Sequence, residues 1–372
     1  MKHTVTFIVL LAFFLSCSEK RESIGVIDYD LTEKISIFNI FESIDVVQLE
    51  TNNNCLISSI SKVIFHDNKY YILDLRLQTL FCFDFEGKFL FKIFQKGQGP
   101  EEYLYVEDFN IDHYNNQLLL LEPFGSLLLF ELDGTFIKKV KLPPEIIAYN
   151  EVYPLMKDRL LFISFNKYQV VYYDRISNTI IEKKYETDER LGNLFTPSYK
   201  TYVYNDDVYF SPPSTNEIIN LSNGASFFWN FGKKNNSLEK IKKLKQEMIN
   251  NGKIPEKDYV GEGYLNYCIL FNYETIRYKL CVLTCGNLKF KHIFFDKQMQ
   301  KSYVFNRTTE NIKFLFSDFS KESIILYDKG FSPELLLPFY NEDNLSDEQR
   351  NLIKCNNSEI DNPFLVKYNF KK

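Results

Sequence analysis

The sequence predicts an all-β protein, a six-bladed β-propeller with an amphipathic helix inserted between blades four and five. Three observations predict it: units of four short strands recur, tight turns separate the strands, and aromatic residues make up 16% of the 372 residues. A four-stranded repeat of roughly 40–50 residues is typical of a propeller blade. Large side chains on both faces of each blade would fill the space between blades, which explains the aromatic excess. A seven-bladed ring and a pair of β-sandwiches are the alternatives, although a sandwich would not need the repeat.

Blades one and two carry the clearest repeat. Two alternating runs flank Glu86-Gly87 in the first, and two flank Asp133-Gly134 in the second, so that the two glycines stand 47 residues apart. Glycine between alternating runs is a strong hairpin signal because it accepts positive φ. The sequence therefore predicts equivalent turns in two consecutive blades.

Four further units follow with weaker repetition. They are expected at residues 151–185, 199–231 and 267–306, and at 312–327 combined with the C-terminal run 363–370. The early strand 43–50 precedes blade one. We expect it to close the ring by joining the last blade, because a closed ring leaves no sheet edge exposed.

One segment breaks the strand pattern. Residues 237–251 place Leu238, Ile241, Leu244 and Met248 at helical spacing, which predicts the inserted amphipathic helix. A shorter helix is expected at residues 346–354. The lysine-rich face of the longer helix is interpreted as a solvated face.

The first 16 residues are interpreted as a signal peptide. Lys2 and His3 precede an apolar run from Val5 to Leu15, which is shorter than the roughly 20 residues that span a bilayer. Leu15-Ser16-Cys17 resembles a bacterial lipobox, after which cleavage leaves a lipid-bearing cysteine at the new N-terminus. Phe14 departs from the commonest form of that motif.

The lipobox resemblance implies a domain layout and a location. Residues 1–16 would be removed, residues 17–42 would form a lipidated tether from Cys17, and residues 43–372 would form the propeller. The lipid on Cys17 makes a membrane the expected partner. We expect an exported monomer at the outer membrane, with the periplasmic and surface sides both open.

A second motif lies between blades one and two, where residues 96–103 read KGQGPEEY. Gly97, Gly99, Pro100, Glu102 and Tyr103 match a loop that resembles the G-x-G-P-G-E-Y loop of six-bladed β-propeller lipoproteins of Bacteroidetes, with Glu101 in place of a glycine. The runs 108–112 and 361–368 also resemble that family. The resemblance implies a six-bladed fold, export and a lipid anchor, and it supplies no catalytic residues. We interpret the loop as structural.

Composition and cysteine spacing exclude several classes of protein. A net charge of −5 and 45% hydrophobic residues exclude a disordered chain, and a pI near 5.6 without a basic block argues against nucleic-acid binding. No CxxC motif occurs and the chain has only four histidines, so we expect no metal site. Besides Cys17, the chain contains six cysteines that we expect to be mainly unpaired: Cys55, Cys82, Cys268, Cys281, Cys285 and Cys355.

Catalytic signatures are missing as well. The chain has no P-loop, no G-x-S-x-G nucleophile elbow and no dinucleotide-binding motif, so we expect no cofactor. His66 and His113 occupy equivalent turns, which indicates repeat sequence more than a shared site, and His292 lies within a strand. Lys62, Asp108, Asp112 and Glu151 fall in or near innermost strands. None of the four stands out as catalytic.

These observations favour a lipid-anchored binding or scaffolding module of the cell envelope whose ligand is unknown. The partner could be an envelope protein, a peptide or a glycan. The alternative is an enzyme that acts on glycans or peptides with carboxylates in the central channel. A third hypothesis is a sensor-like or assembly partner of outer-membrane machinery.

Overall fold

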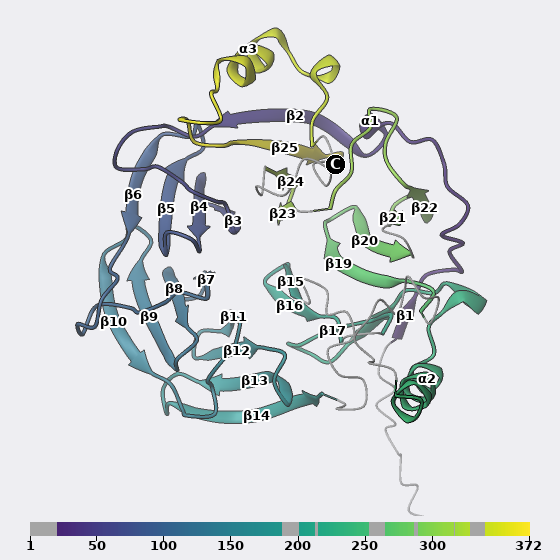
Figure 1. The fold of residues 1–372 in the computed structure, drawn as a ribbon, viewed down its shortest axis with the longest axis horizontal. Coiled ribbons are helices and arrows are strands. Elements are labelled where there is room, and N and C mark those ends of the chain that lie inside the picture. The colour runs from purple at the N-terminus through teal and green to yellow at the C-terminus, as the bar shows by residue number, and fades with distance from the viewer. Residues whose placement is uncertain are drawn as a thin grey trace, which may run out of the picture.

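The protein folds into a ring of six β-sheets around a central axis (Figure 1). This computed structural model describes residues 21–187, 201–212, 215–252, 265–285, 289–315, 317–327 and 339–372. Each sheet contains four strands, except that the fourth sheet gains a fifth. The predicted six-bladed propeller is confirmed.

The strands of the first three blades follow chain order from the innermost strand to the outermost, and each pairs antiparallel with the next. They are β3 (Lys62–His66), β4 (Lys69–Asp74), β5 (Thr79–Asp84) and β6 (Phe89–Ile93); β7 (Asp108–Asp112), β8 (Gln117–Glu122), β9 (Ser126–Glu131) and β10 (Phe136–Lys141); and β11 (Glu151–Met156), β12 (Arg159–Ile163), β13 (Tyr168–Asp174) and β14 (Thr179–Glu186).

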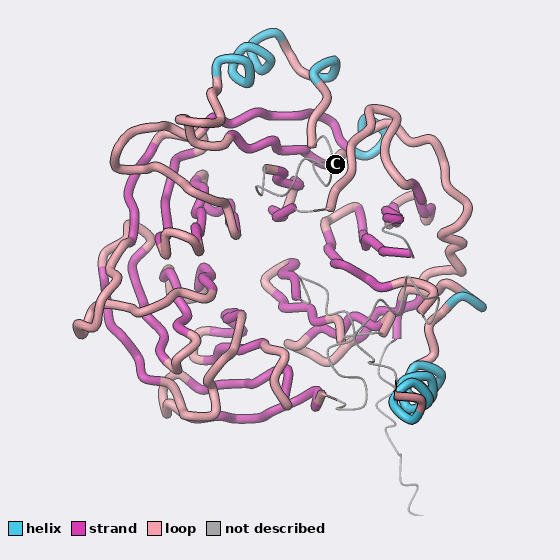
Figure 2. Tube along the Cα trace, viewed as in Figure 1, coloured by secondary structure: helices cyan, strands magenta, loops and turns pink. Residues whose placement is uncertain are grey.

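Blades four to six repeat this arrangement, as the tube in Figure 2 also shows. They are β15 (Thr201–Tyr204), β16 (Asp207–Phe210), β17 (Glu217–Asn220) and β18 (Ser226–Phe228); β19 (Cys268–Glu274), β20 (Tyr278–Cys285), β21 (Lys289–Asp296) and β22 (Lys301–Phe305); and β23 (Ser317–Ser320), β24 (Ser323–Leu326), β25 (Phe364–Phe370) and β2 (Phe41–Gln48). The innermost strands are therefore β3, β7, β11, β15, β19 and β23.

The two ends of the chain share the sixth blade. Strand β2, from the N-terminal part, pairs antiparallel with β25 from Phe41↔Phe370 to Gln48↔Phe364. It forms the outermost strand of that blade, so the expectation that the strand 43–50 closes the ring is confirmed. This pairing gives β25 a partner on both sides and covers an edge that would otherwise be free.

The N-terminal segment differs from the expected tether over residues 17–42. Strand β1 (Arg21–Ser23) adds to blade four beside β18, and the short helix α1 (Ile37–Ile40) leads into β2. Ile27, Ile37 and Ile40 are buried in the same core cluster as blades four to six. From residue 21 onward this segment belongs to the propeller, because its isoleucines bury apolar surface between blades. Residues 1–20, including Cys17, lie outside the described residues.

Two longer helices lie on the outer rim of the ring (Figure 1). Helix α2 (Leu238–Asn250) follows β18 and precedes β19, with Ile241 and Met248 buried. Helix α3 (Asp347–Cys355) precedes β25 and begins with a capping box at Ser346. Single 3₁₀ turns occur at Gly232–Lys234 and Glu342–Asn344.

The ring has two distinct faces because antiparallel strands alternate in direction. On the hairpin face, as we call it, each innermost strand turns into the second strand, at residues 67–68, 113–116, 157–158, 205–206, 275–277 and 321–322. On the opposite connection face the chain passes from blade to blade, for example through residues 94–107 and 142–150.

Five of the cysteines that the structure describes form no disulfide. Cys55, Cys82, Cys281, Cys285 and Cys355 are free thiols. Cys281 and Cys285 both lie in the continuous strand β20, where four residues span about 13 Å, beyond the reach of a disulfide. Burial raises the pKa of the Cys82 thiol to about 12, so this thiol remains protonated.

Gly87 joins the first blade to the closing strand. Its φ is +86°, and a Cβ at this position would lie 2.2 Å from the Gln48 carbonyl oxygen of β2. Gly224 in the corresponding turn of blade four has a φ of +77° with nothing within 4 Å of such a Cβ. Both glycines thus need a positive φ, and only Gly87 also lacks space for a side chain.

We expect Gly87→Ala to lower the free energy of unfolding by about 3 kcal/mol or more, because strain and a backbone collision add. The matched variant Gly224→Ala should cost about 1 kcal/mol, from the positive φ alone. Urea unfolding followed by circular dichroism measures both. Equal losses for the two variants would show that close contact with β2 does not matter.

Candidate functional site

The polar residues that the sequence singles out lie on the innermost strands, and three of them come close together. Lys62 Nζ of β3 lies 2.7 Å from Asp108 Oδ1 of β7 and donates a hydrogen bond to the Phe109 carbonyl oxygen at 2.8 Å. The same ammonium group lies 5.7 Å from the ring centre of Tyr153 in β11, whose hydroxyl donates to Glu151 Oε2 at 2.7 Å. Blades one, two and three therefore meet through these side chains.

Asp108 also joins two blades directly. Its second carboxylate oxygen accepts a hydrogen bond from the backbone N–H of Val152 in blade three, at 3.0 Å. The residue is 5% exposed, so both oxygens are engaged in a buried setting. A carboxylate with such partners is a structural acceptor, since leaving a buried acceptor without partners is costly.

Asp318 makes the same kind of contact between blades six and one, and sequence reasoning missed it. Its Oδ2 accepts from the Val63 backbone N–H at 2.9 Å and from the Tyr327 hydroxyl. The signal was present, because Asp318-Phe319 repeats the Asp108-Phe109 dipeptide in an innermost strand. Repetition of that dipeptide could have identified this tie between blades.

Asp112 lies at the far end of β7 from Asp108 and does not join the cluster. It is fully buried and forms an ion pair with Arg175 of blade three. Its Oδ2 also accepts from the Asn115 side-chain amide at 2.9 Å. This acid fastens the hairpin face of blade two to blade three.

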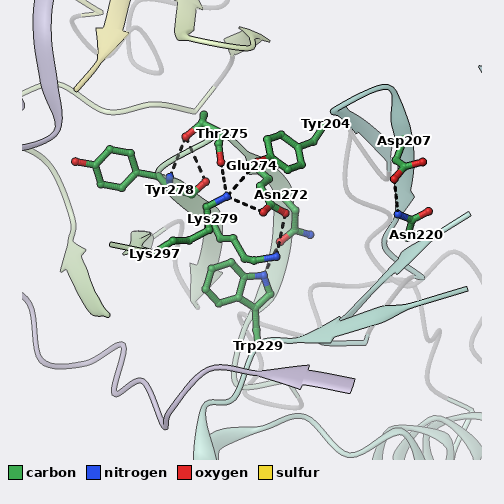
Figure 3. Close-up of polar contacts among 10 residues, drawn as sticks. All are labelled: Tyr204, Asp207, Asn220, Trp229, Asn272, Glu274, Thr275, Tyr278, Lys279 and Lys297. Carbon is green, nitrogen blue, oxygen red and sulfur yellow. Dashed lines mark hydrogen bonds and ion pairs between the residues drawn. The ribbon is translucent and has the colours of Figure 1, made fainter. Parts of the chain in front are cut away.

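A second buried charged cluster lies between blades four and five (Figure 3). Glu274 at the end of β19 is 5% exposed and accepts from Lys279 Nζ at 3.0 Å and from Lys297 Nζ at 2.9 Å. Lys279 Nζ lies 4.4 Å from the centre of the Phe227 ring. The sequence analysis did not identify this cluster, although Glu274 and Lys279 stand opposite each other in the hairpin of β19 and β20.

Trp229 and Asn272 extend the contacts between the same two blades (Figure 3). The Trp229 indole N–H donates to Asn272 Oδ1 at 2.8 Å, and Trp229 is completely buried. The Asn272 amide nitrogen in turn donates to Ser211 Oγ at 3.3 Å. Polar groups at this depth are stabilising because they are paired.

Aromatic rings connect the innermost strands of blades four, five and six. Tyr202 of β15 lies 5.7 Å from Tyr273 of β19, and Tyr273 stacks on Phe319 of β23 at 4.1 Å between ring centres. Burial raises the pKa of both tyrosines, so their hydroxyls stay protonated. The wall of the ring is thus aromatic on one side and charged, through Lys62 and Asp108, on the other.

A hydrogen bond to Glu102 holds the KGQGPEEY loop together. The Gly99 N–H donates to Glu102 Oε2 at 2.7 Å, and a Cβ on Gly97 would lie 1.9 Å from that same oxygen. Tyr103 is fully buried, and its hydroxyl donates to the Gln78 carbonyl oxygen at 2.7 Å. Both glycines leave room for the carboxylate, while Tyr103 fixes the loop to blade one.

Turns from three blades converge on the hairpin face. Asp206 of blade four lies 4.0 Å from His113 Nε2 of blade two and 3.6 Å from Lys321 Nζ of blade six. These turns therefore meet across the ring, with His113 as the contribution of blade two. Burial lowers the pKa of His66. Within the described ranges, no three His, Cys, Asp or Glu side chains are placed to hold a metal ion.

His292 lies in the core, far from any solvent. It is completely buried in β21, stacks on Phe305 at 5.1 Å between ring centres, and its Nε2 accepts from the Phe314 N–H at 3.0 Å. Burial lowers its pKa to about 3. It therefore acts as a neutral acceptor in the fold.

Comparison with known proteins agrees with the fold. A Bacteroides fragilis protein whose name describes it as exported has a crystal structure that matches with a TM-score of 0.68 at 18% identity, covering 95% of this chain and 100% of that one. A member of the DUF4221 family from Bacteroides vulgatus matches with a TM-score of 0.52 at 12% identity, covering 88% and 98%. At such identities the likeness shows the fold alone. No curated protein matches the chain.

The buried histidine makes stability depend on pH. The folded pKa lies below the unfolded value of about 6.5, so the unfolded chain binds the proton first. We expect stability to be full above pH 6.5 and to fall by about 1.4 kcal/mol per pH unit toward pH 3 from this group. His292→Gln keeps an acceptor for Phe314.

Chemical unfolding at a series of pH values measures this effect. Below pH 6.5, His292→Gln should reduce the slope of the unfolding free energy against pH by the amount that corresponds to about one proton, whatever the substitution costs in stability at pH 7. An unchanged slope would mean that His292 is protonated in the folded protein. A variant of the exposed Lys243, such as Lys243→Gln, serves as the control.

The family is settled by a match along nearly the whole chain. The model of a domain of unknown function, DUF4934, matches residues 24–369. This range begins within the N-terminal segment that packs into the ring and ends in β25, so it covers both partners of the closing pair. The chain therefore belongs to the DUF4934 family.

Proposed function

We propose that this protein is an exported, lipid-anchored binding module of the bacterial cell envelope. One observation supports the binding role: the acids on or near the innermost strands, which the enzymatic alternative would require for catalysis, are engaged in contacts between or within blades. Asp108 binds Lys62 and a backbone N–H, Asp112 binds Arg175, and Glu151 accepts from Tyr153. A pair of glycosidase carboxylates would need to face a substrate instead.

The connection face supplies a surface for binding. Seven exposed apolar side chains lie on its loops over blades one to three, with exposures from 37% to 64%: Leu77, Phe94, Leu104, Tyr105, Phe124, Ile147 and Phe165. We call this set the apolar arc. Exposed apolar groups that gather on one face are typical of an interaction site.

Hydrogen bonds hold neighbouring parts of the apolar arc in place. The Val106 N–H donates to the Gln78 side chain at 2.5 Å, and the Leu104 N–H donates to Glu122 at 2.8 Å. Farther along, the Ala148 N–H donates to the Pro123 carbonyl oxygen at 2.8 Å. Loops fixed in this way lose little conformational entropy when a partner binds.

Two further parts of the proposal concern the anchor and the inserted helix. The lipid would be carried by Cys17, on the lipobox at Leu15-Ser16-Cys17. Export is consistent with the name of the Bacteroides fragilis relative in fold. No helix among the described residues is both long and apolar enough to cross a bilayer. In this proposal α2 is the amphipathic insertion between blades four and five.

Lipid anchoring predicts a clear result for Cys17→Ala. The wild-type protein should sediment with membranes and be released by detergent, while the variant should be lost from the membrane fraction, because several acyl chains are needed for stable attachment. Cell fractionation and immunoblotting measure this. Cys355→Ala, which removes an exposed thiol elsewhere, is the control. A Cys17→Ala protein that stays membrane-bound would refute the anchor.

Binding through the apolar arc predicts selective capture. Cross-linked envelope extract should yield partners with the wild-type protein. The double variant Phe124→Ser with Ile147→Ser should reduce their recovery about tenfold or more, because each side chain would contribute over 1 kcal/mol when a partner covers it. Leu31→Ser removes an equally exposed apolar side chain off the arc and should change nothing. Quantitative mass spectrometry measures the recovery of each captured partner.

Identical recovery with both variants would exclude the arc as the binding surface. Cleavage of envelope glycans or peptides by the wild-type protein, abolished by Asp108→Asn without loss of folding, would instead support the enzymatic alternative.

A further inference from the structure

The direction of β1 determines where the chain leaves the ring. Strand β1 runs parallel to β18, with Arg21 opposite Ser226 and Ser23 opposite Phe228. Ser226 directly follows the turn at residues 221–225, which lies on the hairpin face because β17 and β18 pair antiparallel around it. Arg21, where β1 begins, therefore lies at the hairpin-face end of blade four.

The length of chain between Cys17 and Arg21 limits how the ring can sit on a membrane. Four residues reach at most about 14 Å when fully extended. Complete strands such as β3 and β14, with 5 and 8 residues, span about 16 to 26 Å from one face to the other. A lipid on Cys17 can thus lie beyond the hairpin face, whereas the chain is too short to bring the connection face to the same membrane.

Apolar side chains on the hairpin face flank this exit point. Ile176 in blade three is 82% exposed, and Ile276 and Met299 in blade five are 69% and 59% exposed. The turn of blade four between them, at residues 222–225, is exposed and carries no charged residue. We call Ile176, Ile276 and Met299 the hairpin-face apolar set.

Charge also distinguishes this sector of the hairpin face. The outer turns of blades one and two contain the exposed acids Glu86 and Asp133. The corresponding outer turns of blades three and five instead read RISN and KQMQ, with Arg175 and Lys297 as their only charged residues. Both cations are paired with buried acids, so these two outer turns are close to neutral and present their apolar groups without an unpaired carboxylate.

The geometry points to a phospholipid bilayer as the partner of this sector: the hairpin face of blades three to five lies on the membrane that holds the lipid of Cys17, with the hairpin-face apolar set at the boundary between headgroups and acyl chains. This inference rests on the proposed lipid anchor. It fixes the orientation of the ring, so that the connection face and its apolar arc point away from the membrane.

Depth-dependent quenching tests the orientation on the lipidated full-length protein. Single cysteines replace Ile176 or Met299 on the hairpin face, Ile147 on the connection face, and Ile249 on α2 at the rim. All are made in a protein that carries Cys355→Ser. That protein without a new cysteine serves as the control for unspecific labelling. Each protein carries a fluorophore on the new cysteine and is reconstituted in phosphatidylethanolamine and phosphatidylglycerol vesicles that contain lipids with a nitroxide on the acyl chain.

The probes at positions 176 and 299 should lose more than about half of their fluorescence, because interfacial groups lie within roughly 5–10 Å of the acyl boundary. Those at positions 147 and 249 should lose almost none. Stronger quenching at 147 would mean that the connection face meets the membrane, and stronger quenching at 249 would mean that the ring stands on its rim. Either result, or equal quenching at all four positions, overturns the inference.

Mass spectrometry of the N-terminal peptide shows whether Cys17 carries lipid. This measurement distinguishes a wrong orientation from a missing anchor. Protein that carries lipid and binds vesicles but shows no quenching at 176 and 299 overturns the orientation alone. Protein without lipid on Cys17 that does not bind the vesicles refutes the anchor, and the orientation with it.

Discussion

The pairing of β2 with β25 is the interaction on which the rest of the structure depends. The other five blades take their core strands from one continuous stretch of chain, so only the sixth requires segments more than 300 residues apart in sequence to meet. Without β2, the outer edge of β25 would be unpaired, and the last blade would lose the strand that Gly87 of blade one contacts. Closure therefore holds the first and last blades together as well as completing a sheet.

Within the closed ring, buried carboxylates tie neighbouring blades to one another. Asp108 and Asp318 each accept a backbone N–H from the innermost strand of the next blade. Glu274 instead pairs with two lysines of its own blade, whose ammonium groups lie over the rings of Phe227 and Tyr204 in blade four. Charged side chains that are buried and fully partnered specify one arrangement of the blades, because any slip would leave them unpaired. Because these acids stabilise the ring, the proposed binding surface lies on a face of the ring and not on the channel wall.

The two faces then have different roles in the proposed function. Loops on the connection face are fixed by hydrogen bonds and display the apolar arc. The hairpin face carries the start of β1 in blade four, between the blades that expose Ile176 and Met299. An anchor on one face and a binding surface on the other would present the same orientation to every partner. A short connection makes this orientation possible, since a long tether would allow the ring to tumble.

The sequence by itself determined the features that are encoded within a few residues. Turns such as Glu86-Gly87 and Asp133-Gly134, the alternating strands around them and the start of α3 at Ser346 could be predicted, and the repeat of these features yielded six blades. The tertiary structure alone decided which distant groups meet: Asp112 with Arg175, and Asp206 with His113 and Lys321. It also placed residues 21–42 within the propeller, which the polar start of that segment had not indicated. The physical reason is that turn and strand preferences act locally, whereas these contacts exist only after ring closure has fixed the distance and direction between blades.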